Sequence, residues 1–189
     1  MIYEVEVKIE LTKDEKEKLL DVFKEKGFKF KKTTSQKDFY LEANKSQYYD
    51  QCGGYNIRRY RDEGGELIYT GKIWEMVEGH LTRLEDEYNV TKEKFDDEIK
   101  KFPNAAKIEK NRDWFDGEYE GKNISITIDT VKFSHSPDTR YFIEAEIRVE
   151  DKNKTKETKD FLISFMEELL GRDEIVEAPT MSTMILEGK

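Results

Sequence analysis

The stretch that decides the fold is Glu-Val-Glu-Val-Lys at residues 4–8. Charged and apolar side chains alternate here without interruption, and the alternation extends from Tyr3 to Leu11. A period of two is that of a β-strand, so this strand has one apolar face and one ionic face. For a single strand, the simplest interpretation is an antiparallel sheet whose ionic face meets water.

The pattern returns later in the chain, and its repetition favours a different interpretation. Arg83, Glu85 and Glu87 share one face of a predicted strand, and Glu144 and Glu146 share a face of another. Roughly eight predicted strands cannot all expose charged faces and still enclose a core unless the sheet curls or closes. The sequence therefore predicts an α+β fold, a closed or nearly closed antiparallel eight-stranded β-barrel with flanking helices and a charged interior.

Three helices are expected around these strands. Thr12 stands three residues before Glu15, a capping box that opens a helix ending at Gly27. A second helix is predicted over residues 91–103 and a third, with a broad apolar stripe, over about 155–170.

Turn signals mark a hairpin in the first half of the chain. Short strands are expected over residues 28–32 and 37–42, joined by Thr-Thr-Ser. The Asp-Glu-Gly-Gly run at residues 62–65 predicts a hairpin between strands over 55–61 and 66–74. This hairpin brings several basic side chains into one neighbourhood.

Composition restricts the class of protein. A chain of 189 residues suits one domain, expected over residues 1–189, and a 36% hydrophobic fraction with 11 Phe and 10 Tyr argues against disorder.

Charge and hydropathy bear on the partners of the protein. The net charge of −9 disfavours nonspecific nucleic-acid binding, which needs clustered cations. No apolar run approaches the ~20 residues that span a bilayer, and no signal-peptide pattern opens the chain, so a cytoplasmic protein without a membrane partner is expected. The single cysteine excludes an intramolecular disulfide.

The charged faces combine two kinds of chemical group. Carboxylate oxygens are the ligands that Mg²⁺ and Mn²⁺ prefer, and Lys and Arg side chains bind phosphate oxygens. Phosphoryl transfer needs mainly such positioning and charge neutralisation. If the faces converge, the interior would hold, beside the arginines of the hairpin, Glu4, Glu6, Lys8, Lys72, Arg83, Glu85, Glu87, Lys110, Arg112, Asp129, Glu144 and Glu146.

These residues match a known family in order along the chain. Glu4-x-Glu6-x-Lys8 resembles the E-x-E-x-K signature of the CYTH superfamily, the triphosphate tunnel metalloenzymes, which includes class IV adenylyl cyclases, thiamine triphosphatases and inorganic triphosphatases. The other family motifs that are matched are Asp38-x-Tyr40, Thr70-x-Lys72, Arg83-x-Glu85-x-Glu87, Lys110-x-Arg112, and Asp129 followed by Phe142-Ile143-Glu144-Ala145-Glu146. Each motif alone is weak, whereas the ordered set is specific.

The resemblance implies a role for each group of residues. It implies a Mg²⁺ or Mn²⁺ cofactor, and Lys8 would act in catalysis with Glu4 and Glu6. The implied metal ligands are Glu4, Glu6, Glu144 and Glu146, with Glu87 and Asp129 as further candidates. The implied triphosphate ligands are Lys72, Arg83, Lys110, Arg112 and arginines among Arg58, Arg59 and Arg61. The competing interpretation of every one of these residues is a cross-strand salt bridge inside a barrel.

Two questions stay open at this point, namely which arginines bind phosphate and which activity the protein has. Strand alternation favours Arg58 as the family's binding arginine, whereas the distance to Thr70 favours Arg59-x-Arg61. The expected activity is hydrolysis of inorganic triphosphate, ATP or thiamine triphosphate, and the closest rival is a class IV adenylyl cyclase that forms cyclic AMP and pyrophosphate. A nucleotide or polyphosphate binder without turnover is a third possibility, and a homodimer is common for this kind of fold.

Overall fold

A computed structural model describes residues 2–40, 56–77, 80–103, 105–181 and 184–185. For residues 56–57, 72–77 and 80–85 it describes the backbone alone. The single cysteine, Cys52, lies outside the described residues.

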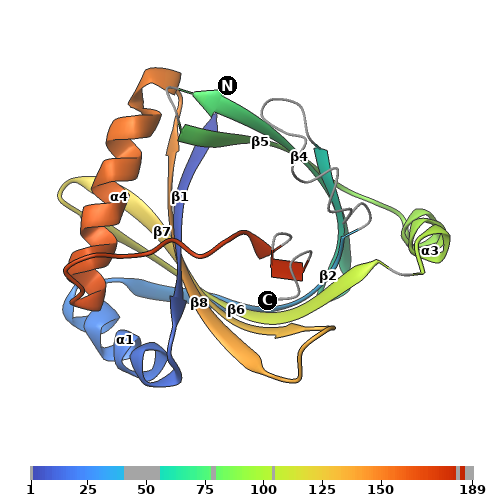
Figure 1. Cartoon of the computed structure of the whole chain (residues 1–189), viewed down its shortest axis with the longest axis horizontal. Helices are drawn as coiled ribbons and strands as arrows, with labels where there is room; N and C mark the ends of the chain where they lie inside the picture. Colours follow the sequence, from blue (N-terminus) through green and yellow to red (C-terminus); the bar gives the residue numbers. More distant parts are fainter. Residues whose placement is uncertain (1, 41–55, 78–79, 104, 182–183, 186–189) are drawn as a thin grey trace. The chain divides into compact units, whose positions relative to one another are not determined.

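The elements assigned in the described part of the chain are eight strands, three α-helices and one 3₁₀ helix; Figure 1 shows how they are arranged. In chain order these are β1 (Tyr3–Leu11), α1 (Lys13–Glu25), β2 (Lys29–Tyr40), β3 (Asn56–Glu63), β4 (Glu66–Val77), β5 (His80–Asn89), α3 (Lys92–Lys101), β6 (Ala106–Tyr119), β7 (Lys122–Phe133), β8 (Thr139–Val149), η1 (Lys152–Lys154) and α4 (Thr155–Leu170). Hydrogen bonding orders the strands as β1-β5-β4-β3-β2-β6-β7-β8, the order of a closed barrel. The predicted fold, an eight-stranded antiparallel barrel with flanking helices, is confirmed.

The structure divides into two compact units. Unit 1 comprises residues 1–33, 111–131 and 139–178. Unit 2 comprises residues 34–110, 132–138 and 179–189. The expectation of a single domain over residues 1–189 stays a prediction.

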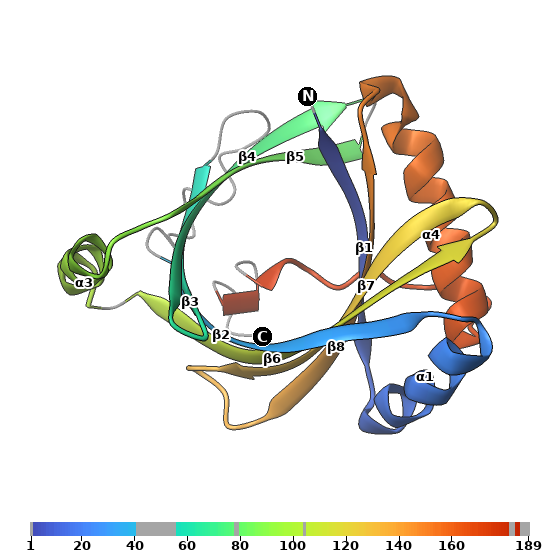
Figure 2. The same cartoon turned by 180° about the vertical axis from the view of Figure 1, so that it is seen from behind.

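The core of unit 1 lies between the helices and the apolar face of β1. Val7 and Ile9 are fully buried, as the alternation at residues 3–11 predicts, and they pack in one cluster with residues of α1 and α4. Figures 1 and 2 show both helices on the same side of β1. Burying each such side chain contributes roughly 1.5–3 kcal/mol. The opposite face of β1, which carries its charges, is therefore the one left for chemistry.

The ends of the helices follow their capping signals. Thr12 and Glu15 form the predicted capping box at α1. Gly171 caps the C-terminal end of α4, and its positive φ of 61° suits glycine.

The segment that follows α4 returns to β1, because the backbone N–H of Ala178 donates to the carbonyl of Lys8 over 2.8 Å.

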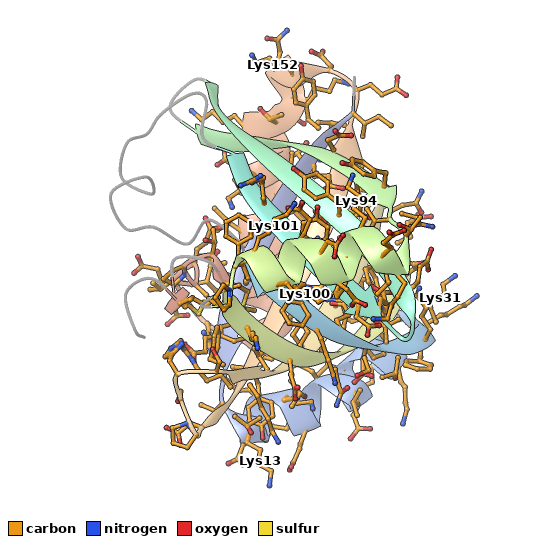
Figure 3. The ribbon with its side chains drawn as sticks, turned by 90° about the vertical axis from the view of Figure 1, so that its right-hand side faces the viewer. Lys13, Lys31, Lys94, Lys100, Lys101 and Lys152 are labelled. Carbon is orange, nitrogen blue, oxygen red and sulfur yellow. The ribbon has the colours of Figure 1, made fainter. Side chains whose placement is uncertain are left out.

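Unit 2 is built on the predicted hairpin of β3 and β4. Its loop is Gly64-Gly65, and both residues have positive φ, as a tight two-residue turn requires. Tyr60 of β3 packs edge-on against Phe95 of α3. The rest of α3 is largely exposed, and Figure 3 shows its lysines on the helix surface.

One sequence-based boundary is wrong. The Thr-Thr-Ser run at residues 33–35 does not separate two short strands, because β2 continues from Lys29 to Tyr40. Thr is β-branched and suits a pleated strand, so these residues extend the strand rather than turn it.

Candidate functional site

The strands β1 and β8, which come from opposite ends of the sequence, are hydrogen-bonded neighbours in unit 1. Their antiparallel register pairs three charged positions of each strand: Glu4 with Arg148, Glu6 with Glu146, and Lys8 with Glu144. Side chains directly opposite each other in such a ladder are in contact range. The register therefore gathers carboxylates and cations on one face of these two strands.

Glu144 lies between two cations. Lys8 Nζ is 2.6 Å from Glu144 Oε2, and Arg112 Nη2 of β6 is 3.7 Å from Glu144 Oε1. The side chains of Lys8 and Glu144 are only 12% and 9% exposed. In such a partly dry setting, attraction between opposite charges is stronger than in water. Lys8, Glu144 and Arg112 thus form one charged cluster of the predicted site in unit 1.

Arg112 is held from its other side by Asp129 of β7. Arg112 Nε and Nη2 donate to the two oxygens of Asp129, each over 2.7 Å, and Asp129 is buried. A bidentate pair of this kind fixes the plane of the guanidinium group. Asp129 therefore orients Arg112, and its expected part in metal binding stays a prediction.

Glu146 lies in an environment that disfavours its charge. Burial raises the pKa of Glu146, and the nearby carboxylates of Glu144 and Glu6 raise it further. Arg148 opposes this shift, because its guanidinium donates to Glu146. The pKa of Glu146 nevertheless stays above its ordinary value, which marks a place where added positive charge would be stabilising.

Arg148 is a site residue that sequence reasoning missed. Its Nε donates to Glu146 Oε1 and its Nη2 donates to Glu4 Oε1, both over 2.9 Å. The sequence does contain a signal, since Glu144, Glu146 and Arg148 alternate along one face of β8. The family motifs end at Glu146, so they give no role to Arg148.

The donor set suits a hard divalent cation. Carboxylate oxygens are the preferred ligands of Mg²⁺ and Mn²⁺, and a cation beside Glu146 would offset the burial and the repulsion from Glu144 and Glu6 that raise the pKa of Glu146. As the side chains stand, no three His, Cys, Asp or Glu residues of the described part of the chain are grouped closely enough to share an ion. Glu144 and Glu146 turn toward Lys8 and Arg148 instead.

A second polar cluster lies in unit 2 around Asp38 of β2. Arg61 Nε and Nη2 donate to Asp38 Oδ1 and Oδ2 over 2.6 and 3.1 Å, Lys110 Nζ lies 3.7 Å from Oδ2, and Arg59 Nη1 lies 4.0 Å from it. Burial alone would raise the pKa of Asp38, but the charges of Arg61, Arg59 and Lys110 outweigh it and hold the pKa well below its usual range. Asp38 thus organises three of the expected phosphate ligands.

Arg59 also reaches across the β3–β4–β5 ladder. Its Nη2 donates to Thr70 Oγ1 over 2.7 Å, and Thr70 Oγ1 in turn donates to Glu87 Oε2 over 3.0 Å. Glu87 is half exposed and belongs to unit 2. This chain of contacts holds the guanidinium of Arg59, and the expected role of Glu87 as a metal ligand stays a prediction.

The arginines of β3 lie on different faces of the strand. Arg59 and Arg61 share one face of β3, where both are buried and contact Asp38 of the neighbouring strand β2. Arg58 lies on the other face, with its guanidinium carbon 5.8 Å from the centre of the Phe102 ring. The structure therefore brings Arg59 and Arg61 together and does not bring Arg58 to them.

Three expected site residues have side chains outside the described part of the structure, namely Lys72, Arg83 and Glu85. Their backbone positions are described. Lys72 of β4 pairs with Glu85 of β5, two positions along the ladder from the pair of Thr70 and Glu87. The ladder thus aligns the Thr-x-Lys and Arg-x-Glu-x-Glu motifs as neighbours.

Comparison with known proteins identifies one family and several solved structures with a similar fold. The CYTH domain family model matches residues 3–178. The PH1819 protein of Pyrococcus horikoshii OT3 has a similar structure, with a TM-score of 0.69 and 23% identity over 99% of this chain and 100% of that one. The PH1012 protein of the same organism has a TM-score of 0.65 and 18% identity over 96% and 98% of the two chains.

A third similar structure is a proposed adenylate cyclase from Vibrio parahaemolyticus. It has a TM-score of 0.63 and 16% identity over 99% of this chain and 98% of that one. At these identities the likeness concerns the fold.

The sequence matches no curated protein. Among the helices of the described residues, none combines the length and the apolar character needed to cross a membrane.

Proposed function

The chain belongs to the CYTH domain family, and from this premise we propose that it is a divalent-metal-dependent enzyme that acts on a triphosphate group. The observation that carries the proposal is the β1–β8 ladder, which places Lys8 against Glu144 and Glu6 opposite Glu146. Close carboxylates of this kind are costly unless a cation offsets them. A structural salt-bridge network alone does not require Glu6 and Glu146 to face each other.

Each group of residues has a proposed task. Glu4, Glu6, Glu144 and Glu146 would hold Mg²⁺ or Mn²⁺, which when bound neutralises phosphate charge and polarises the phosphorus–oxygen bonds. Lys8 and Arg112 have donors that can bind phosphate oxygens, and Asp129 keeps the guanidinium of Arg112 in one orientation. In unit 2, the family resemblance implies Lys110 and arginines among Arg58, Arg59 and Arg61 as ligands of phosphate oxygens, and we propose Arg59 and Arg61 because they lie beside Asp38.

Hydrolysis of the terminal phosphoryl group is the activity we propose first. It needs a water in line with the phosphorus, and the residues above need only position and neutralise the triphosphate. Adenylyl cyclisation is the second candidate, in which the 3′-hydroxyl of ATP attacks the α-phosphorus and pyrophosphate leaves. The fold likeness to the proposed adenylate cyclase of Vibrio parahaemolyticus favours keeping it.

The deciding experiment compares three substrates and resolves their products. Purified protein is incubated with Mg²⁺ or Mn²⁺ and inorganic triphosphate, ATP or thiamine triphosphate, and phosphate, pyrophosphate and cyclic AMP are separated. Phosphate release identifies a triphosphatase, whereas cyclic AMP with pyrophosphate identifies the cyclase. Tight binding of a triphosphate without any product would leave a binding protein and overturn both activities.

Variants connect the activity to the site. Lys8→Met should abolish turnover, because it removes a cation proposed to contact phosphate. Arg140→Gln is the matched control, since Arg140 of β8 makes a bidentate pair with Glu10 of β1, between the same two strands, and neither residue belongs to a matched motif. Equal activity of both variants would contradict the assignment of the site. A homodimer and a cytoplasmic location stay predictions.

A further inference from the structure

Arg148 joins two carboxylates that the proposed function assigns to a metal ion. It stands directly opposite Glu4 in the β1–β8 ladder and two positions after Glu146 on its own strand. One guanidinium group donates to both, through Nη2 to Glu4 and through Nε to Glu146. A single positive charge is thus shared between two negative ones and offsets them only in part.

The exposure of these side chains is uneven. The side chain of Arg148 is 64% exposed, whereas those of Glu4 and Glu146 are 23% and 21% exposed. The guanidinium therefore reaches the carboxylates from the solvent side. Since most of its surface already meets water, Arg148 can turn away at little desolvation cost, whereas the carboxylates stay where the strands hold them.

We propose that Arg148 is an internal counter-ion that competes with a divalent cation for Glu4 and Glu146. Arg148 offsets part of the charge of the two carboxylates in the metal-free protein and withdraws toward solvent when the cation binds. This inference rests on the proposed metal dependence, and it makes Arg148 a competitor of the metal ion and not a catalytic residue. By this competition, Arg148 lowers the affinity of Glu4 and Glu146 for the cation below the affinity that they would have without the arginine.

A second arginine of β8 provides the control that distinguishes this role from that of an ordinary salt bridge. Arg140 also lies on β8 and also pairs with a glutamate of β1, through Nε and Nη2 to the two oxygens of Glu10 over 2.6 Å each. Glu10 belongs to none of the matched motifs. Arg140→Gln thus removes a comparable interstrand pair and leaves Glu4 and Glu146 unchanged.

The test measures Mn²⁺ binding to the substrate-free protein by isothermal titration calorimetry, together with the melting temperature with and without Mn²⁺. Arg148→Gln should bind Mn²⁺ roughly five- to tenfold more tightly than the wild type, as expected from two weak, partly exposed ionic contacts. Its metal-free form should melt at a lower temperature, and its stabilisation by Mn²⁺ should be larger. Arg148→Lys, which keeps the charge, should lie between the two, and Arg140→Gln should match wild-type affinity.

Other outcomes overturn the inference in distinguishable ways. Wild-type Mn²⁺ affinity in Arg148→Gln would show that Arg148 is only an interstrand salt bridge. Weaker binding would show that Arg148 orients the carboxylates for the metal. If neither the wild type nor Arg148→Gln binds Mn²⁺ or Mg²⁺, both this inference and the proposed metal dependence fail, whereas unchanged affinity in a wild type that binds metal refutes only the role of Arg148.

Discussion

Lys8 Nζ lies 2.6 Å from Glu144 Oε2, and the two residues are direct partners in the β1–β8 ladder. Arg112 approaches the other oxygen of the same carboxylate. Glu144→Gln keeps the shape of the side chain but removes the anion that these cations share. We expect the free energy of unfolding to fall by about 1–3 kcal/mol and turnover of the triphosphate substrate to fall at least ~100-fold. Thermal melting and product release measure the two effects.

Arg140→Gln is again the control for this change, because it breaks an ion pair between the same strands outside the motifs. Its turnover should remain close to that of the wild type. Retention of full activity by Glu144→Gln would remove Glu144 from the site.

Asp38 should be a main stabilising residue of unit 2. Arg61, Arg59 and Lys110 surround its buried carboxylate, so Asp38→Asn leaves three buried cations without that charge. Breaking such a buried ionic cluster costs on the order of 3–5 kcal/mol. Urea denaturation of the wild type and the variant measures the difference, and a loss below about 1 kcal/mol would contradict the role we give to Asp38.

The same residue predicts a pH dependence. The pKa of Asp38 in the folded state lies below its ordinary value, because Arg61, Arg59 and Lys110 outweigh the effect of burial. Its stabilising contribution is therefore fully present above the unfolded-state pKa of about 3.9 and is lost as the pH falls through the folded-state pKa. The stability difference between wild type and Asp38→Asn should be constant near neutral pH and shrink below about pH 4. A difference that grows on acidification would have the wrong sign.

Gly117 of β6 allows a close approach to Phe28. A Cβ atom at this position would lie 2.3 Å from Cδ1 of the Phe28 ring, which is buried and cannot easily move. Gly117→Ala should therefore lower the free energy of unfolding by about 1–3 kcal/mol, as overpacking in a core does. Gly71→Ala is the matched control, since the nearest atom to its Cβ would be 3.4 Å away. Equal stability of both variants would show that the ring moves aside.

The two faces of β3 should differ in their effect on substrate binding. Arg59 lies on the polar face with Asp38 and Thr70, whereas Arg58 lies over the Phe102 ring. We expect Arg59→Met to raise KM for the triphosphate substrate about tenfold or more, as the loss of a charged hydrogen bond does. Arg58→Met should change KM much less. The opposite ranking in steady-state kinetics would favour the register in which Arg58 binds phosphate.

The sequence by itself determined most of the fold and named most of the candidate site residues. The alternation at residues 3–11 fixed which face of β1 is buried, because in a strand successive side chains point to opposite faces. The capping box at Thr12 and the Gly64-Gly65 turn are local hydrogen-bond and dihedral effects, so they too can be predicted from neighbouring residues. The order of the motifs along the chain is enough to single out Glu4, Lys8 and Glu144 as candidate site residues.

Only the tertiary structure decided which charged groups meet. The register of β1 on β8 places Lys8 against Glu144 and Arg148 against Glu4, and a shift of one residue would reverse the faces of a strand. Which arginines of β3 meet Asp38 depended in the same way on the pairing of β3 with its neighbours. Such pairings join residues far apart in the chain, and no local pattern encodes them, because they result from packing of the whole sheet against its helices.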